Sequence, residues 1–199
     1  MLQIHTINSL TSNTTLFDQV FRDRAHQFCQ RMGWDLKRDH QGRELDEYDN
    51  PNSVYIVWVD PNGRHLGSVR LMPTSSQSMI ADHFQGHFDE KSVESDGCWE
   101  VTRFCVSPEL PKSEISVVSR ELVKSAFIYC AEQHAKCLVG LCFPTMLRLY
   151  RRLDCAPDQT VVSKLDSSLV LARWDVDFSR ILELYSTKSG KSTSALLMA

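Results

Sequence analysis

Apolar positions near the start of the chain recur every three to four residues, the spacing that places side chains on one face of a helix. They are Leu16, Phe17, Val20, Phe21 and Phe28. Thr15 followed by Asp18 is a typical helix start, and Gly33 is a typical helix end. The pattern therefore predicts a helix from Thr15 to about Arg31.

A different pattern follows. Residues 35–51 are polar and charged and end in Asp-Asn-Pro, which predicts a long loop. Residues 53–59 are rich in β-branched and aromatic side chains, which favour a strand. Asp-Pro-Asn-Gly at 60–63 is typical of a turn, and residues 65–71 are again strand-like. Together these residues predict a hairpin.

The rest of the chain alternates between strand-like and helix-like patterns. Residues 73–98 hold few apolar positions and predict an excursion over one face of the fold. After it we expect a strand at 99–106, a connector at 108–113, a helix with apolar positions from Ile115 to Cys130, a strand at 137–143, a helix at 145–153 with Pro144 at its first position, and strands at 160–165 and 168–176.

This order of elements predicts an α/β fold with one three-layer core. It fits the acyl-CoA N-acyltransferase type of fold, in which a mixed, mostly antiparallel sheet splays open in the middle. Other α/β sandwiches share the same order of elements. We expect a single domain over residues 1–186 and a flexible tail, rich in Ser, Thr and Lys, over residues 187–199.

Composition and charge exclude several classes of protein. The chain has 199 residues, 42% of them hydrophobic and 24% charged, as in ordinary globular domains. Its longest apolar runs, such as Val54–Val59, are far shorter than the ~20 residues of a membrane-spanning helix. The first residues lack the pattern of a signal peptide, so we expect a cytoplasmic protein. The net charge of −3, with no run of like charges, gives no indication of nucleic-acid binding.

Cysteine and histidine spacing argues against a metal site. None of the seven cysteines forms a C-x-x-C pair, so the sequence predicts neither a disulfide framework nor a cysteine-type zinc site. Most cysteines are expected to be reduced and buried as small apolar residues. The histidines also lack the spacing of metal ligands, and we predict no metal.

Several charged residues lie where neither a core nor a plain loop needs them. They are the arginines Arg24, Arg70 and Arg103 and the acids Glu44, Asp46, Asp49 and Glu100. Buried charges persist when they are paired, so this set predicts an ion-pair network. Taken without any family resemblance, a purely structural network is the favoured interpretation, because such networks are common.

Four spaced motifs carry a resemblance to a known family. They are Arg24-x-x-x-Phe28-x-x-x-x-Gly33-Trp34, Asp46-x-x-Asp49, Gly67-x-x-Arg70-Leu71 and Trp99-Glu100-x-x-Arg103-Phe104. With this order and spacing, residues 16–110 resemble the LuxI-type acyl-homoserine lactone synthases. The resemblance implies an enzyme that passes an acyl group to the amine of S-adenosylmethionine and closes the product to a lactone, with methylthioadenosine leaving. It also implies that S-adenosylmethionine is a substrate and that no cofactor takes part.

The implied chemistry gives three of these residues catalytic roles. Acylation needs a neutral amine, and Glu100 is our candidate for the base that accepts its proton. Arg103 would hold the substrate carboxylate for lactone closure, and Asp46 would hold the ammonium group. Because side chains alternate along a strand, Glu100 and Arg103 reach one cleft only if the strand bulges between them, so we expect a bulge near residues 101–102.

The remaining motif residues are assigned to S-adenosylmethionine binding. Phe28 and Trp34 offer aromatic faces to the sulfonium group, which gains cation–π attraction there. Arg24, Asp49 and Arg70 would brace the loop through charge-assisted hydrogen bonds.

The acyl pocket is expected to come from the second half of the chain. Its predicted walls are Val101, Phe104, Leu141, Cys142, Met146, Leu149 and Leu153. Family members that make 3-oxo signals often carry a Ser or Thr hydroxyl in the strand near Cys142. Residues 141–143 here have no hydroxyl, so an unsubstituted acyl chain is expected.

The acyl donor is either an acyl carrier protein or acyl-CoA. Residues 107–113 contain two prolines and no glycine, so the usual glycine-rich pyrophosphate loop is missing, which favours the carrier protein. Arg148, Arg151 and Arg152 share one helix face and are our candidate docking site for an acidic carrier. Two other functions stay open: a generic acyl-CoA-dependent amine N-acyltransferase, and a non-catalytic binding domain.

Overall fold

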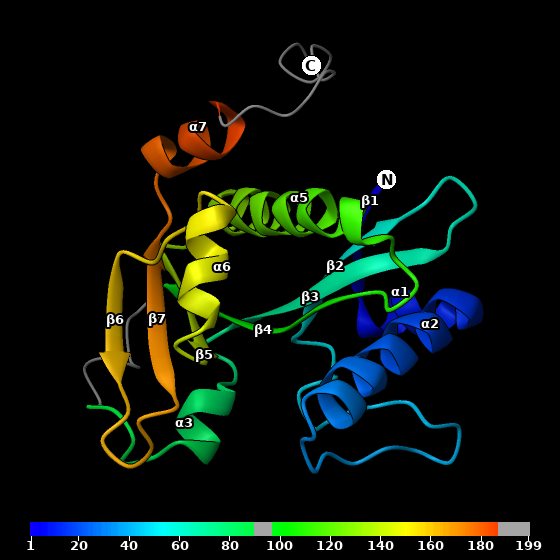
Figure 1. Cartoon of the computed structure of the whole chain (residues 1–199), viewed down its shortest axis with the longest axis horizontal. Helices are drawn as coiled ribbons and strands as arrows, with labels where there is room; N and C mark the ends of the chain where they lie inside the picture. The colour runs from blue at the N-terminus through cyan, green and yellow to red at the C-terminus, as the bar shows by residue number, and fades with distance from the viewer. Residues whose placement is uncertain (90–96, 187–199) are drawn as a thin grey trace.

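The computed structural model describes residues 1–89 and 97–186, and its centre is one seven-stranded sheet (Figure 1). The strand order is β1-β2-β3-β4-β5-β7-β6, and every neighbouring pair is antiparallel except β4 and β5. The strands are β1 (Leu2–Thr6), β2 (Val54–Val59), β3 (His65–Pro73), β4 (Cys98–Val106), β5 (Cys137–Cys142), β6 (Gln159–Val162) and β7 (Val170–Asp175).

Helices cover both faces of this sheet (Figure 1). They are α1 (Ile7–Ser12), α2 (Thr14–Ala25), the π-helix η1 (His26–Arg31), α3 (Met79–His83), α5 (Lys112–Glu132), α6 (Met146–Arg152) and α7 (Phe178–Ser186). The helix α5 packs on one face, while α1 and α2 pack on the other face beside β2. The short helix α3 lies on that second face over β4 and β5.

The alternation of side chains along β2 explains this layering. Tyr55, Val57 and Val59 point toward α2 and are at most 1% exposed, whereas Ile56 points to the core beneath α5. Both faces of the strand are therefore apolar, because both are covered by helices. The three-layer arrangement predicted from the sequence is confirmed.

Most predicted elements are present, and the differences are shifted helix ends and several elements that the pattern did not predict. The hairpin, the long helix α5 and the pairing of β6 with β7 agree with the pattern. The first predicted helix begins one residue early, capped by Asn13, and becomes a π-helix at His26. The predicted helix after Pro144 begins at Met146 with Thr145 as its N-cap, so Pro144 is not its first residue. The edge strand β1 and the helices α1, α3 and α7 were not predicted.

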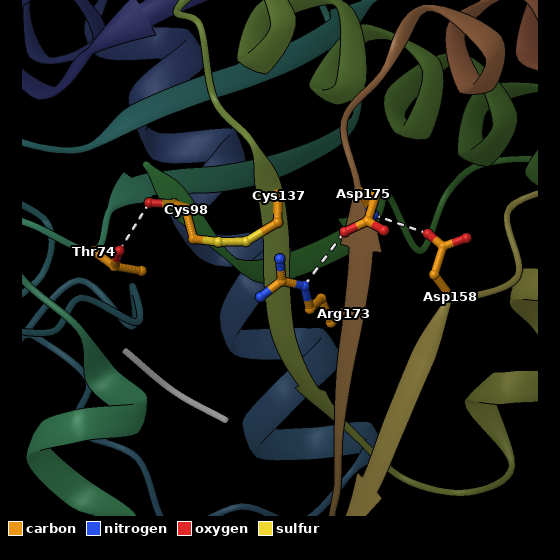
Figure 2. Close-up of a disulfide and its surroundings, with 6 residues drawn as sticks. All are labelled: Thr74, Cys98, Cys137, Asp158, Arg173 and Asp175. Atoms are coloured by element: carbon orange, nitrogen blue, oxygen red, sulfur yellow. Dashed lines mark hydrogen bonds and ion pairs between the residues drawn. A yellow bond between two sulfur atoms is a disulfide. The ribbon is translucent and has the colours of Figure 1, made fainter. Parts of the chain in front are cut away.

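The structure corrects the expectation about disulfides. Cys98 and Cys137, the first residues of β4 and β5, are joined by a disulfide across this parallel pair (Figure 2). In the same view the Thr74 hydroxyl donates a hydrogen bond to the Cys98 carbonyl at 2.8 Å. The two cysteines are 39 residues apart in sequence and meet only through strand pairing, which local spacing does not reveal. The other five cysteines are free, and four of them are buried.

Two expectations concern the chain as a whole. Within residues 1–89 and 97–186, no helix is long and apolar enough to span a lipid bilayer. The tail predicted over residues 187–199 lies outside the described residues.

Candidate active site

A cavity opens where the central sheet splits. β4 and β5 pair only over Cys98–Glu100 and Cys137–Val139, and then they diverge. At the point of divergence a Cβ atom on Gly140 would lie 2.9 Å from Val101 Cγ1 and 3.0 Å from the Val101 carbonyl oxygen, so only glycine fits there. Beyond this contact the strands line a cavity of about 950 Å³.

The cavity continues from one face of the sheet to the other. On the face that carries α2 and α3 its lining includes Phe28, Trp34, Asp46, His83 and Phe84. On the face that carries α5 and α6 its lining includes Leu122, Phe127, Tyr150, Cys155 and Trp174. One end is therefore polar and aromatic, and the other is largely apolar.

A bulge in β4 directs the Arg103 side chain into the polar end of the cavity. Ser68 pairs with Cys105 and Arg70 pairs with Thr102, so Arg103 and Phe104 together oppose the single residue between them on β3. Arg103 has a φ of +54°, the left-handed conformation typical of the first residue of such a bulge. The predicted bulge thus lies at Arg103–Phe104 rather than near residues 101–102. The bulge brings Arg103 to the face on which Thr102 contacts Arg70, but only Arg103, and not Glu100, lines the cavity.

Three arginines and three carboxylates alternate in a network at this end. Arg24 donates to Glu44 at 2.7 Å and to Asp49 at 2.8 Å. The other four contacts are Arg70 to Asp49 at 2.9 Å, Arg70 to Asp46 at 2.9 Å, Arg103 to Asp46 at 2.8 Å and Arg103 to Glu44 at 3.0 Å. The formal charges of the six groups cancel. The predicted ion-pair network is therefore present, and Glu100 makes no ion pair in it.

The loop holds its carboxylates by backbone and tyrosine contacts. The Asp49 carboxylate accepts the backbone N–H of Asp46 at 2.8 Å and the hydroxyl of Tyr55 at 2.7 Å. Burial opposes ionisation of Asp49, but the guanidinium groups of Arg24 and Arg70 outweigh it and hold its pKa well below the usual range. Asp49 therefore stays charged at all physiological pH values.

Asp46 has no free acceptor position. One carboxylate oxygen accepts the Tyr48 N–H at 2.9 Å and a short hydrogen bond from Arg70, and the other accepts hydrogen bonds from both Arg70 and Arg103. A carboxylate has about four such positions. The geometry therefore favours a bracing role for Asp46 over the predicted direct contact with a substrate ammonium group.

Arg103 keeps one donor group for a ligand. Its Nε and Nη2 atoms contact Glu44 and Asp46, whereas no hydrogen bond from its Nη1 atom is found within the described part of the chain. Arg103 also lines the cavity. A carboxylate bound in the polar end would be able to reach this group.

The sequence predicted Glu100 in the wall of the cavity. In the structure it lies beneath α3 instead. It is fully buried, and its Oε2 atom accepts the Ser78 hydroxyl at 2.8 Å and the Ile80 N–H at 3.4 Å. Its Oε1 atom has no hydrogen-bond partner among the described residues. Burial raises the pKa of Glu100 to about 7. An acid with this pKa can exchange a proton near neutral pH.

Two aromatic rings stack beside the network. Phe28 and Trp34 lie with their centroids 5.2 Å apart and their planes inclined by 23°, and the Arg103 guanidinium lies 5.5 Å from the Phe28 centroid. The π-helix η1 carries Phe28, and the backbone N–H of Trp34 donates a hydrogen bond to the backbone carbonyl of Phe28 at 2.9 Å. Trp34 remains 36% exposed, so its free face is open to a cation.

The predicted acyl-pocket residues divide into two groups. Val101, Phe104, Leu141, Cys142 and Met146 line the cavity. Leu149 and Leu153 do not, because α6 is rotated so that Met146 and Tyr150 face the cavity and these leucines pack in the core. The three arginines proposed for docking, Arg148, Arg151 and Arg152, are exposed on α6.

Several residues of the site were missed in the sequence. Ser78 caps α3 and contacts Glu100, but it lies in the segment interpreted as an excursion. Thr102 accepts a hydrogen bond from Arg70 at 3.0 Å. Ser78 has a local signal, since a serine before a short apolar run is a typical helix cap. Within the described residues no group of three or more His, Cys, Asp or Glu is placed to hold a metal ion.

Comparison with known proteins adds an independent finding. A profile described as autoinducer synthase matches residues 8–197. An acyl-homoserine-lactone synthase from Rhizobium etli is 34% identical over 181 residues, covering 88% of this chain and 84% of the relative. Another from Ralstonia solanacearum is 30% identical over 170 residues, covering 81% and 83%.

Solved structures extend the likeness to the fold. The structure of BjaI, described as a CoA-dependent acyl-homoserine lactone synthase with S-adenosylmethionine and isopentyl-CoA, matches with a TM-score of 0.74. The sequence identity is 20%, and the match covers 93% of this chain and 87% of that one. The predicted fold class, with its splayed mixed sheet, is confirmed.

Proposed function

The chain belongs to the autoinducer synthase family, from which we infer that it is an acyl-homoserine-lactone synthase acting on S-adenosylmethionine. The observation that carries this inference is the continuous cavity, which joins a charged, aromatic end to an apolar end at the split of the sheet. Such a cavity accommodates a polar sulfonium substrate and an acyl chain on either side of one reaction centre. The cytoplasmic location stays a prediction.

The first step is acyl transfer. The neutral α-amine attacks the thioester carbonyl, a C–N bond forms, the C–S bond breaks, and the donor leaves as a thiolate, which then takes up one proton from water. The amine gives up a proton, and we assign its acceptance to Glu100 through an intervening water molecule, because Glu100 does not line the cavity. The free Oε1 atom and the raised pKa of Glu100 support this role.

The second step is lactone closure. A carboxylate oxygen of the methionyl group attacks its own γ-carbon, the bond to sulfur breaks, and the sulfur keeps the electron pair as methylthioadenosine leaves. The sulfonium group is already activated, so the protein mainly has to fold the chain into attack geometry. The free Nη1 group of Arg103 supports its assignment to the carboxylate, and Glu44 and Asp46 hold this arginine in place.

Replacing Arg103 with alanine separates the two steps. We expect the KM for S-adenosylmethionine to rise about ten- to a hundredfold, because a charge-assisted hydrogen bond is lost. We also expect an acylated, uncyclised product that mass spectrometry detects. Arg64→Ala, at an exposed arginine outside the cavity, serves as the control. A lower lactone yield without any open-chain product would contradict the assigned role of Arg103.

The apolar end supports a role in acyl-chain binding. Val101 and Phe104 on β4, Cys142 on β5 and Met146 on α6 line the cavity and pack in the core on the face that carries α5. Leu141 also lines the cavity but packs on the opposite face, beneath α3. Burying each methylene group of a chain there contributes about 0.8 kcal/mol.

The donor is assigned to an acyl carrier protein rather than acyl-CoA. Residues 107–113, which lead into α5, contain two prolines and no glycine, so they lack the glycine-rich cradle of backbone N–H groups that usually binds a pyrophosphate. Met146 and Tyr150 face the cavity, which leaves Arg148, Arg151 and Arg152 on the outer face of α6. An acidic carrier on this face would deliver its arm close to the apolar end.

Reversing the charges of Arg151 and Arg152 to glutamate tests this docking face. We expect the KM for carrier-bound acyl groups to rise about tenfold and its salt dependence to flatten, while the KM for S-adenosylmethionine stays within about twofold. Lys112→Glu, at the far end of α5, is the matched reversal. Unchanged kinetics with the carrier would place the docking face elsewhere or indicate acyl-CoA as the donor.

The proposed function is tested by product analysis. Purified protein is incubated with S-adenosylmethionine and either acyl donor, and methylthioadenosine is measured. Release that depends on the acyl donor is expected. Acylation of other amines without methylthioadenosine would indicate a generic N-acyltransferase, and no turnover with any donor would indicate a binding domain.

A further inference from the structure

The largely apolar end of the cavity contains a tyrosine hydroxyl. Tyr150 on α6 lines the cavity beside Cys142, Cys155 and Trp174. Its ring meets the Trp174 ring edge to face, with centroids 5.1 Å apart and planes at 87°. No hydrogen bond to its hydroxyl is found anywhere in the described ranges, 1–89 and 97–186. A hydroxyl is both a donor and an acceptor, so an interaction is missing here.

Two observations place this hydroxyl inside the cavity. The pKa of Tyr150 is raised, first by burial and then by the nearby Cys142 and Cys155 side chains, which both line the cavity. Among the described residues, the side-chain polar atoms that are both fully buried and without a hydrogen-bond partner are Glu100 Oε1 and Arg120 Nε. The Tyr150 hydroxyl oxygen is not one of them. It therefore stays accessible, and the accessible space beside those two thiols is the cavity.

We propose that the Tyr150 hydroxyl forms a hydrogen bond with an oxygen atom on the distal part of the acyl chain, so that the cavity favours acyl groups carrying a hydroxyl or carbonyl there. This proposal rests on the proposed function. The observation that carries it is the Tyr150 hydroxyl, which has no hydrogen-bond partner among the described residues and lies beside the weakly polar thiols of Cys142 and Cys155 in the largely apolar end of the cavity.

The position of Tyr150 separates the distal end of the chain from its reacting end. The reaction centre lies near the split of β4 and β5, where Val101 and Gly140 are in contact. Tyr150 lies on the face of the sheet that carries α5 and α6, where its ring packs on Trp174 of β7. The charged end of the cavity lies on the opposite face, so an acyl chain that extends from the split past Trp174 brings its distal part to Tyr150. The prediction from residues 141–143 concerns only an oxygen next to the thioester.

The experiment uses the full chain and its Tyr150→Phe variant. Three acyl groups of equal length are supplied on an acyl carrier protein and as CoA thioesters: one unsubstituted, one with a hydroxyl near the thioester, and one with a hydroxyl near the methyl end. In the variant, we expect the ratio of kcat/KM for the methyl-end hydroxyl to that for the unsubstituted chain to fall about tenfold. The ratio for the other hydroxyl should stay constant.

Tyr129→Phe is the matched control. Tyr129 also meets a tryptophan edge to face, with its centroid 5.7 Å from that of Trp99, but it does not line the cavity. Its removal should leave both ratios unchanged. An equal ratio in wild type and Tyr150→Phe, or the same shift in Tyr129→Phe, would overturn the proposal.

Direct binding separates this proposal from the proposed function. Calorimetry measures the Kd of N-acyl-homoserine lactones with and without the methyl-end hydroxyl, for wild type and for Tyr150→Phe. If wild type binds the lactone with the methyl-end hydroxyl about tenfold more tightly and Tyr150→Phe does not, the proposed hydrogen bond is supported even if no acyl thioester is turned over. No preference in wild type contradicts it, whatever the catalytic result.

Discussion

Replacing Glu100 with glutamine is expected to lower the acylation rate about 10²–10⁴-fold, the usual effect of losing a general base. Glutamine has the same shape and keeps an oxygen for the Ser78 hydroxyl, but it accepts no proton at neutral pH. S-Adenosylmethionine binding should be retained, because Glu100 is outside the ion-pair network. Single-turnover kinetics and a separate binding measurement check both parts.

The pH profile gives a second signature of the same group. With the pKa of Glu100 at about 7, the acylation rate of the wild type should rise as the pH increases through 7, since only the ionised form accepts a proton. The residual rate of Glu100→Gln should not follow this rise. Glu109→Gln, at an exposed glutamate that is 74% accessible, is the control. Turnover of Glu100→Gln near the wild-type rate would show that another base or bulk water acts.

Stability should change in the opposite direction. The folded protein keeps the Glu100 proton up to about pH 7, whereas the unfolded chain releases it near the ordinary glutamate pKa of 4.5. Between these values the folded state binds more protons, so the wild type loses stability as the pH rises and the loss is complete above about pH 7. The gap corresponds to roughly 3 kcal/mol, which Glu100→Gln should recover. Loss of activity with retained stability excludes simple misfolding.

Replacing Arg24 with leucine is expected to destabilise the fold by about 3–5 kcal/mol, because it leaves buried carboxylates without their partner. Glu44 and Asp49 are each 1% exposed and both contact Arg24. Arg70 and Arg103 compensate only in part, since each already binds other carboxylates. Denaturant unfolding at neutral pH measures the loss.

The neighbouring Arg22 provides the control for this prediction. It lies on the same helix and pairs with Asp18 at 2.7 Å, but its side chain is 52% exposed. Arg22→Leu should change stability by less than about 1 kcal/mol, as is typical of exposed pairs. Similar losses for both variants would mean that the buried network does not stabilise the fold more than a surface pair does.

The parts of the structure that follow from local pattern were predictable from the sequence. The hairpin and α5 each have a regular spacing of apolar residues and are bounded by residues typical of turns or connectors. The charged residues of the network were also predictable, because each interrupts an apolar or plain polar segment. Their pairing follows from the rule that buried charges have partners.

The features that depend on long-range geometry were not predictable. A bulge at Arg103 rather than two residues earlier depends on the register between β3 and β4. Burial of Glu100 depends on where α3 lies, and the disulfide of Cys98 depends on the pairing of β4 with β5. The rotation of α6, which exchanges Leu149 for Tyr150 in the cavity wall, is set by packing and not by helical period.

The central claim is that one cavity brings an acyl chain and S-adenosylmethionine together for two successive steps. S-Adenosylmethionine labelled with ¹³C in its methionyl carbons tests this claim most directly, with products followed by mass spectrometry. The account predicts that the label appears in an N-acyl-homoserine lactone, with one methylthioadenosine released for each lactone formed. An acylated amine product without the label, or methylthioadenosine released without any lactone, would contradict it.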